Sequence, residues 1–477
     1  MKGNDTVALF TYRHGPWVWA LSLVLGVLGG VALSRAIPAS FDASGAPIIK
    51  PALVTPFALL LLLIAVMPLV AKRIWHRHYG DFALGLGGLV AGYYLAAFGH
   101  SAPGLSYGQE KVLHALEEFY AFIALVGGLY VVSGTILIKI EGRASPLVNT
   151  LLLAAGAVLA NLVGTTGASM LLIRPLMRLN EGRIRPIHIV MFIFIVSNCG
   201  GCIMPMGDPP LYLGFLKGVP FLWTIEHLWP DWLITVGPLL AIFFVIDTAI
   251  ARKATAPGPD APTRITIRGK RGLVFLLLMV AGVFVDPALE RLAGISDMPI
   301  GATFQIMIAW SAYASAPKAI LSANEFSFFP VKEVGLLFTG IFLTMMPALG
   351  YLGSHGPQLG LNSATSYYFS TGVLSACLDN APTYLNFFQI AAAPHELNPA
   401  AISQYLSTHE GMLHLRAIST GAVFFGGMTY IGNGPNFMVQ AIADAAGVKT
   451  PSFFGYIGWA LLILLPVLAV HWAVLIR

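Results

Sequence analysis

The sequence predicts an all-α polytopic membrane protein of about 11 transmembrane helices plus two re-entrant hairpins. Its 477 residues are 57% hydrophobic and only 10% charged, whereas a soluble domain carries about a quarter charged residues. Apolar runs such as 52–71 are long enough to cross a bilayer. Helix-breaking Gly, Pro, Asn and Thr recur inside apolar stretches of both halves, a pattern typical of membrane proteins with discontinuous helices.

The spans are predicted from apolar runs of near-bilayer length. In chain order they are 17–33, 52–71, 82–98, 117–138, 187–218, 232–251, 272–286, 300–314, 332–350, 414–446 and 454–476. Two of these spans are expected to be broken, one near 205–210 and the other near 429–436, where Gly and Pro interrupt the helix. The first run lacks a small-residue cleavage site, so we expect a retained span and not a signal peptide.

Two further segments, 147–178 and 366–393, do not fit as single spans. Each has two apolar arms of about 10–14 residues around a polar tip, which is the length expected of a re-entrant hairpin. A polar tip at membrane depth is tolerated where protein or a water-filled cavity satisfies its backbone. We therefore expect both tips to reach the protein interior.

Basic residues set the expected orientation. The connections 72–78, 174–185 and 252–271 are rich in Lys and Arg, whereas 219–231 and 394–413 contain neither. Placing the basic connections in the cytoplasm satisfies the positive-inside bias. The chain is then a multi-pass protein of the inner (cytoplasmic) membrane, with the N-terminus in the cytoplasm and the C-terminus outside, in the periplasm.

The same orientation predicts the domain organisation. Segments 106–251 and 272–450 each contain a hairpin and a broken span, and they cross the membrane in opposite senses. This arrangement predicts two inverted repeats, separated by the basic cytoplasmic linker 252–271. Residues 1–105 are then accessory transmembrane helices, and 451–477 form a C-terminal transmembrane helix.

The candidate site lies at four helix breaks, one in each hairpin and one in each broken span. Asp208 follows Asn161 by 47 residues, and Asn433 follows Asp379 by 54. Amide, hydroxyl and carbonyl oxygens at such breaks suit a hard cation such as sodium. The candidate ion- or substrate-binding residues are Asn161, Gly164, Thr165, Thr166, Asp208, Pro209, Asp379, Asn380, Thr383, Asn433, Gly434 and Asn436.

Two of these residues are acids, Asp208 and Asp379, and they are the candidate proton-coupling groups, because a carboxylate at membrane depth is costly and usually functional. A sodium ion is predicted at Asp208 and Asp379 together with Asn161 and Asn433. The alternative is that these residues only cap short helices, since Asn, Asp and Thr are common N-caps and Pro209 suits a first helical position. Tips at matched positions in both halves favour binding.

Four other polar residues carry weaker signals. Glu118 and Glu333 extend the match between the halves, but both lie near span ends, where a solvated carboxylate is at least equally expected. Asn198 precedes the first broken-span motif; it could contribute an oxygen to the site, but a hydrogen bond across helices is favoured slightly. His188, beside a basic connection, is expected at the membrane interface.

The motifs at the breaks resemble those of the ion transporter superfamily, the clan of citrate, dicarboxylate and arsenite permeases and of related bacterial sodium:proton antiporters, and they are most similar to the antiporter branch. The resemblance covers roughly residues 110–450. It rests on NLVGTTGASMLLIRP (161–175), SNCGGCIMPMGDPPLYLGF (197–215), KEVGLLFTGIF (332–342), LDNAPTYLNF (378–387) and YIGNGPNFM (430–438). It implies two inverted repeats, a homodimer, and sodium and substrate bound at hairpin tips and helix breaks.

The leading functional hypothesis is secondary sodium/proton antiport by alternating access. Two acids, with no Lys or Arg expected at the membrane midplane, suit a cation better than a di- or tri-anion. The alternative is sodium-coupled transport of citrate or a dicarboxylate, because half-helix N-termini bind carboxylates without a basic side chain. The expected partners are the lipid bilayer and a small inorganic cation or small organic acid, with no nucleic acid.

An enzyme or an inert scaffold is disfavoured. The sequence contains no metalloprotease, nucleotide-binding or hydrolase motif, and its cysteines and histidines are not clustered along the chain. The three cysteines, Cys199, Cys202 and Cys377, are expected to pack in apolar surroundings. No cofactor is expected, and sodium and the proton would be the coupled ions.

Overall fold

In the computed structural model of the protein, most of the chain forms helices, and several of them are long and apolar. Seven helices in the part of the chain described below are long and apolar enough to cross a membrane, which supports the predicted multi-pass class. They are Trp17–Ala36, Pro51–Val70, Tyr107–Gly134, Pro146–Leu179, Phe221–Arg252, Phe329–His355 and Phe453–Ile476. The structure describes residues 16–41, 47–99, 105–141, 144–253, 264–293, 299–393 and 397–477.

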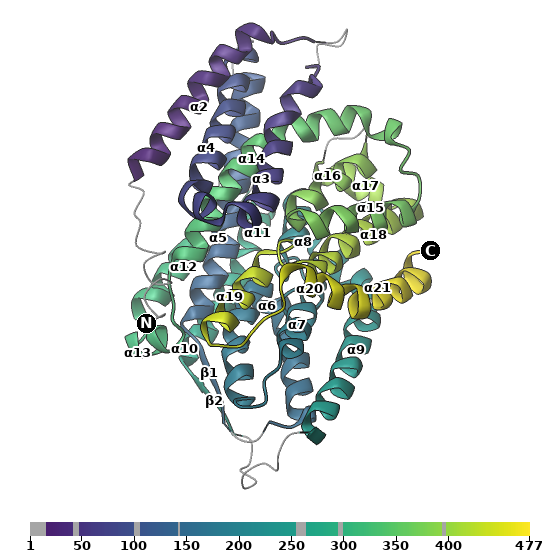
Figure 1. The fold of residues 1–477 in the computed structure, drawn as a ribbon. Coiled ribbons are helices and arrows are strands. Elements are labelled where there is room, and N and C mark those ends of the chain that lie inside the picture. Colours follow the sequence, from purple (N-terminus) through teal and green to yellow (C-terminus); the bar gives the residue numbers. More distant parts are fainter. Residues whose placement is uncertain are drawn as a thin grey trace. The chain divides into compact units, whose positions relative to one another are not determined.

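The helices divide into two compact units, traced along the chain in Figure 1. Unit 1 comprises the described parts of Met1–Tyr120 together with Phe329–Ser354. Its elements are α2 (Pro16–Ala36), the 3-10 turn Pro51–Val54, α3 (Thr55–Val70), α4 (Lys72–Ala97), the first part of α5 (Tyr107–Gly134) and nearly all of α14 (Phe329–His355).

Unit 2 comprises the described parts of Ala121–Phe328 and His355–Arg477. Its first half contains the end of α5, α6 (Pro146–Leu179), α7 (Pro186–Ile195), α8 (Pro209–Leu216), α9 (Phe221–Lys253), α10 (Lys270–Gly282), α11 (Val285–Ala293), α12 (Ile300–Ser315) and α13 (Lys318–Ala323). Its second half contains α15 (Ala364–Cys377), α16 (Asn380–Ala392), α17 (Pro399–Leu406), α18 (His409–Phe425), α19 (Gly434–Ala445), α20 (Phe453–Trp459) and α21 (Leu465–His471).

Glycines let α2 and α4 of unit 1 lie side by side (Figure 1). A Cβ atom added at Gly26, Gly30 or Gly92 would lie 2.3, 2.1 or 2.3 Å from a backbone carbonyl oxygen of the opposing helix. Small residues are how membrane helices achieve close backbone packing where there is no hydrophobic driving force between them. This interface therefore depends on the absence of side chains at these three positions.

The substitution Gly30→Ala is expected to destabilise unit 1, whereas Gly29→Ala is expected to be close to neutral. The new methyl at Gly30 meets the rigid Leu89 carbonyl, and overpacking of this kind costs about 1–3 kcal/mol. At Gly29 it would lie 3.2 Å from Leu89 Cδ1, the end of a flexible side chain. Thermal unfolding of both variants in detergent measures the difference; equal melting temperatures would contradict the packing argument.

Helix α7 forms the most deeply buried part of unit 2. Every residue from Ile189 to Ile195 is 0% exposed. A helix that is apolar on all sides is stable only when neighbours surround it completely. It packs against α6, α9 and α19, which places the first helix break, directly after α7, inside the unit.

The predicted all-helical class is confirmed, and a short two-stranded antiparallel ribbon accompanies the helices. Strand β1 (Leu137–Glu141) pairs with β2 (Arg264–Arg268), with Glu141 opposite Arg264. Alternating apolar and polar residues in both strands favour extended backbone. The second strand lies in the predicted linker 252–271, of which residues 254–263 lie outside the described part.

Some helix boundaries also differ from the prediction. Helix α9 begins at Phe221, so the predicted connection 219–231 is mostly helical. The predicted span 272–286 is divided between α10 and α11, and the connection 394–413 contains the short helix α17. The inverted repeats and their membrane orientation stay predictions.

Candidate functional site

Four interruptions of helical backbone carry the candidate residues, and all four lie in unit 2 (Figure 1). Inside α6 the backbone leaves the helical conformation at Gly164. Between α7 and α8 the chain is not α-helical over residues 196–208, and between α18 and α19 over 426–433. Helices α15 and α16 are separated by Leu378 and Asp379.

The break in α6 requires glycine. Gly164 has φ 76° and ψ 156°, a region that residues with a side chain essentially do not occupy. The arms on either side fold back on each other, since Asn149 and Asn180 exchange side-chain hydrogen bonds of 2.8 and 2.9 Å. The next residue, Thr165, donates its backbone N–H to Gly207 O at 2.8 Å, which joins the tip of α6 to the α7–α8 break.

Asp208 lies where the four breaks meet. It precedes α8 in extended conformation, but its side chain accepts no bond from the helix backbone. Its Oδ1 accepts from Thr165 Oγ1 at 2.8 Å and from Asn433 Nδ2 at 3.0 Å. Its Oδ2 accepts from Asn380 Nδ2 at 2.6 Å. One carboxylate therefore has a side-chain donor from each of the other three breaks.

The charge of Asp208 has no basic partner. The side chain is only 1% exposed, and none of the ion pairs in the described part of the chain includes it. A buried carboxylate normally pairs with a cation, because removal of a charge from water is costly. Three neutral donors stabilise the charge only in part, so the arrangement suits a small cation.

Asn380 supplies an oxygen that has no hydrogen-bond partner. Its Nδ2 is bonded to Asp208, whereas its buried Oδ1 has no hydrogen-bond partner, and the residue is 1% exposed. Buried unsatisfied acceptors are rare in folded proteins and call for an explanation such as an ion or water. A carboxylate and an unpaired amide oxygen on adjoining residues are ligands suited to a hard cation.

Asn161 hydrogen-bonds to the backbone through both its amide nitrogen and its amide oxygen. Its Nδ2 donates to Ala157 O at 3.0 Å and Gly200 O at 2.7 Å. Its Oδ1 accepts from the backbone N–H groups of Ile203 and Met204 at 2.8 and 3.3 Å. Both lone pairs of that oxygen are thus in use, so in this conformation Asn161 fastens α6 to the first break.

Asn436 has a similar role at the second broken span. Its Nδ2 donates to Gly426 O and Thr429 O at 2.8 and 2.9 Å. Its Oδ1 accepts from Asn198 Nδ2 at 2.7 Å, and Asn198 Oδ1 accepts from Asn433 at 3.3 Å. Asn198 therefore bonds across helices, as expected, and joins the two broken spans.

Asp379 and Thr383 cap α16. Asp379 Oδ1 accepts from Ala381 N at 3.0 Å, and Thr383 Oγ1 donates to Asp379 O at 2.9 Å. Asp379 is partly exposed, unlike Asp208. Because Asn380 is in contact with Asp208, the two acids lie in the same region of unit 2. Gly434, the first residue of α19, is exposed.

A small pocket adjoins Asp208. It is lined by part of α5, the α6 tip and the start of α8, including Thr166 and Pro209. Its volume for the centre of a water-sized sphere is about 20 Å³, and about 10–15 Å³ is enough to hold one water. In this conformation the pocket has room for one ion or one water, and a larger molecule needs the site to open.

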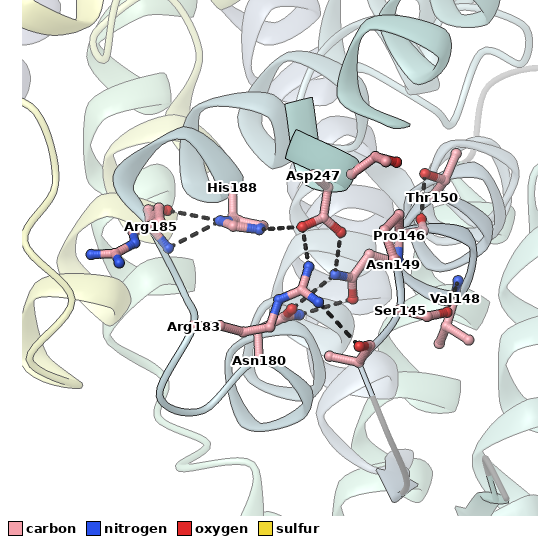
Figure 2. A network of polar contacts seen from close by, with 12 residues as sticks. Ser145, Pro146, Val148, Asn149, Thr150, Asn180, Arg183, Arg185, His188 and Asp247 are labelled. Atoms are coloured by element: carbon pink, nitrogen blue, oxygen red, sulfur yellow. Dashed lines mark hydrogen bonds and ion pairs between the residues drawn. The ribbon is translucent and has the colours of Figure 1, made fainter. Parts of the chain in front are cut away.

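A second polar cluster surrounds Asp247 of α9 (Figure 2). The Asp247 side chain is 0% exposed and pairs with Arg183. It also accepts from Asn149 Nδ2 at 2.7 Å and contacts His188 Nε2 at 3.1 Å. We call these four residues the Asp247 cluster. It joins the two ends of the α6 hairpin to α9, and His188 within it is 0% exposed.

Arg416 is the basic partner of another buried acid. It lies on α18 and donates through Nε to both carboxylate oxygens of Asp231 on α9, at 3.0 and 2.9 Å. A basic side chain is therefore present in a predicted span, although a buried acid pairs with it. The prediction overlooked Asp231 and Asp247, yet both acids adjoin or interrupt apolar runs, which is the signal that identifies intramembrane ionisable residues.

The two glutamates that extended the match between the halves lie in unit 1. Glu118 of α5 is 9% exposed and contacts His114 Nε2 at 3.1 Å. Glu333 of α14 is partly buried. Neither is one of the residues around Asp208.

Apolar helices interrupted at a buried carboxylate define a multi-pass membrane protein with an internal polar site. The chain belongs to the family described as "Putative citrate transport", whose profile matches residues 47–476. This family is part of the ion transporter superfamily, so the protein is a transporter and not an enzyme. A search of curated proteins gave no match.

The family match revises the order of the functional hypotheses. It supports transport of a small organic acid such as citrate, the alternative in the sequence analysis, better than sodium/proton antiport. It does not extend to the antiporter branch. The implied substrate is thus an anion, whereas the buried carboxylate favours a cation, and a function must account for both.

Proposed function

We propose that the protein is a sodium-coupled secondary transporter of citrate or a related small carboxylate. The observation that carries the proposal is Asp208, a buried carboxylate with three neutral donors and no basic partner. A sodium ion would bind between Asp208 and the unpaired Oδ1 of Asn380. Thr165 and Asn433 would orient the carboxylate.

Electrostatics would then couple ion to substrate. A citrate anion next to an uncompensated carboxylate is strongly repelled at low dielectric. A bound sodium ion neutralises Asp208, so the positive N-terminal ends of the α16 and α19 helix dipoles can attract substrate carboxylates. The anion would therefore bind only after the cation, which is a physical basis for symport.

Alternating access would use the four breaks as the moving parts. Under this proposal the α6 and α15–α16 hairpins are re-entrant, belong to inverted repeats and enter from opposite sides of the membrane. The tight pocket beside Asp208 corresponds to a closed conformation, since it has room for little more than a water. A homodimer, as the resemblance implies, belongs to the same proposal.

Uptake of labelled citrate into proteoliposomes tests the function. An inward sodium gradient is expected to drive uptake, and replacement of sodium by choline is expected to abolish it. Succinate as a competitor would report the breadth of the carboxylate site. Absence of citrate and succinate uptake under every gradient would contradict the proposal.

Sodium/proton antiport remains a second candidate because the site contains two acids, Asp208 and Asp379, in one region. It predicts that sodium alone, without any carboxylate, changes the internal pH of proteoliposomes. A pH-sensitive dye inside the vesicles measures this directly. Proton flux with no citrate uptake would favour antiport, and citrate uptake with no sodium-driven proton flux would exclude it.

A further inference from the structure

A second buried cluster in unit 2 also contains an aspartate, an arginine and a histidine. The hydrogen bonds of its histidine differ from those in the Asp247 cluster. His471 of α21 contacts Asp231 Oδ1 through Nε2 at 2.7 Å, and Arg416 pairs with the same carboxylate. His471 Nδ1 lies 3.0 Å from the hydroxyl oxygen of Tyr368 on α15. We call these four residues the Asp231 cluster. His471 and the Asp231 side chain are 0% exposed.

The Tyr368 hydroxyl accommodates both protonation states of His471. It lies 3.2 Å from Leu468 O, to which it donates in the present arrangement. Its oxygen is then free to accept a proton from Nδ1, while Nε2–H donates to Asp231 and both ring nitrogens carry hydrogen. When the Nδ1 proton leaves to water, the hydroxyl turns from Leu468 O and donates to the bare nitrogen. Tyrosine keeps its proton, and one proton in total is released.

The Asp247 cluster lacks this freedom (Figure 2). His188 Nδ1 accepts the backbone N–H of Arg185 at 3.0 Å, and a backbone N–H cannot reverse into an acceptor. Arg185 O is farther, at 3.2 Å. A proton on Nδ1 would oppose the N–H of Arg185, so this hydrogen bond requires a bare Nδ1 in His188. The two clusters differ in the group that faces Nδ1 of the histidine. It is a rotatable hydroxyl at His471 and a fixed backbone N–H at His188.

The helix around His471 is also irregular. His471 is the last residue of the short helix α21, which lies between two π-helical segments, Ala460–Leu464 and Trp472–Ile476. Such segments are rare and are found mostly at functional sites. Histidine is the side chain that most readily gains and loses a proton near neutral pH. The other titratable or charged groups facing this cluster are the thiols of Cys199 and Cys202, which interact electrostatically with Tyr368.

The cluster is connected to the Asp208 region through two elements. Trp232, next to Asp231 in α9, donates its indole N–H to Gly200 O at 2.9 Å. The same carbonyl accepts from Asn161 of the α6 tip at 2.7 Å. Arg416 lies on α18, the helix that ends at the break in the second broken span. A change of one unit of charge at His471 therefore acts on neighbours of both broken spans.

We propose that His471 is a proton-binding site of the transport cycle, with Tyr368 as its reversible hydrogen-bond partner and Asp231 and Arg416 holding the ring in place. Proton binding itself does not depend on the proposed substrate; only its coupling to uptake rests on the proposed function. The proton is then a coupled ion bound away from Asp208 and Asp379.

The first test is a pH titration of the full-length protein in detergent, with its 12 histidines labelled with carbon-13 in the ring and followed by NMR. The signal missing from His471→Gln is expected to be one that changes with pH in the wild type. The signal missing from the matched control, His188→Gln, is expected to stay constant. A constant His471 signal, or equal titration of both histidines, would overturn the proposal.

Tyr368→Phe provides a second route if His471→Gln does not fold. It leaves the histidine in place, and the titrating signal that it perturbs identifies His471. If no titrating signal changes in Tyr368→Phe, the proposed hydroxyl partner is wrong.

The second test separates proton coupling from substrate identity. Citrate uptake by wild-type proteoliposomes is expected to vary with pH, by up to about tenfold per pH unit for a single proton, and His471→Gln is expected to flatten that profile. An unchanged profile would contradict coupling. Titration of His471 in a protein that takes up no citrate would instead reject the proposed substrate and leave the proton site in place.

Discussion

Replacement of Asp208 by Asn is expected to abolish sodium-dependent citrate uptake while the protein stays folded. The substitution keeps the size of the side chain and removes only its charge. An amide NH₂ at position 208 would face the Asn380 Nδ2 that now donates to it at 2.6 Å. The Asn380 amide can rotate, however, so that its unpaired Oδ1 accepts instead. The hydrogen-bond network survives, and the charge does not.

The expected loss is large because the site is buried. An ion pair at about 4 Å with an effective dielectric constant of about 20 contributes about 4 kcal/mol, which corresponds to about a thousandfold in affinity. We expect sodium activation of uptake to weaken by at least about 100-fold. Uptake of labelled citrate against sodium concentration measures the effect, and size-exclusion chromatography verifies the fold.

Two matched variants sharpen this test. Asp444→Asn removes an exposed carboxylate from α19 and is expected to retain wild-type uptake. Asp379→Asn preserves an oxygen for the bond to Ala381 N and distinguishes a one-carboxylate site from a two-carboxylate site. Full sodium dependence in Asp208→Asn would remove the basis for the proposed ion site.

The variant Asp247→Ala is expected to produce the largest loss of stability. It removes the acceptor for Arg183, His188 and Asn149 at once (Figure 2). Breaking a buried ion pair from one side costs about 3–5 kcal/mol, because the remaining charge is buried without a partner. We expect the apparent melting temperature in detergent to fall by at least about 5 °C, measured by a thiol-reactive dye or by loss of the monodisperse peak.

A double variant tests the electrostatic origin of this effect. Arg183→Met combined with Asp247→Leu removes both charges and substitutes apolar side chains of similar volume. Such replacements are often neutral or stabilising, so the pair is expected to recover most of the loss caused by Asp247→Ala. Equal melting temperatures for Asp247→Ala and the double variant would indicate that packing, and not an unpaired charge, determines stability here.

The sequence was informative about breaks and less informative about partners. Gly164, Asp208, Asp379 and Asn433 all lie at helix interruptions, because Gly, Asn and Asp–Pro are poorly tolerated within helices. Which break contacts which depends on packing between residues as far apart as 238 positions, and no local pattern encodes that contact.

Asn161 illustrates the limit most clearly. From the sequence, an amide at a hairpin tip can equally be an ion ligand or a hydrogen-bond partner of neighbouring backbone. The bonds of Asn161 to Gly200 and Ile203 depend on tertiary packing, which no local pattern encodes. Asp231 and Asp247 were overlooked for a related reason. Hydropathy averages hide a single acid among apolar residues, and its basic partner comes from a distant part of the chain.

The three donors around Asp208 have a consequence for biosynthesis. Thr165 precedes Asp208 in the chain, but Asn380 and Asn433 follow it by 172 and 225 residues. At a translation rate of about 5–20 residues per second, Asn433 emerges roughly 10–45 s after Asp208. During that interval the nascent chain holds an unmatched carboxylate among apolar segments. Polypeptides truncated before Asn433 are thus expected to be retained at the insertion machinery and degraded.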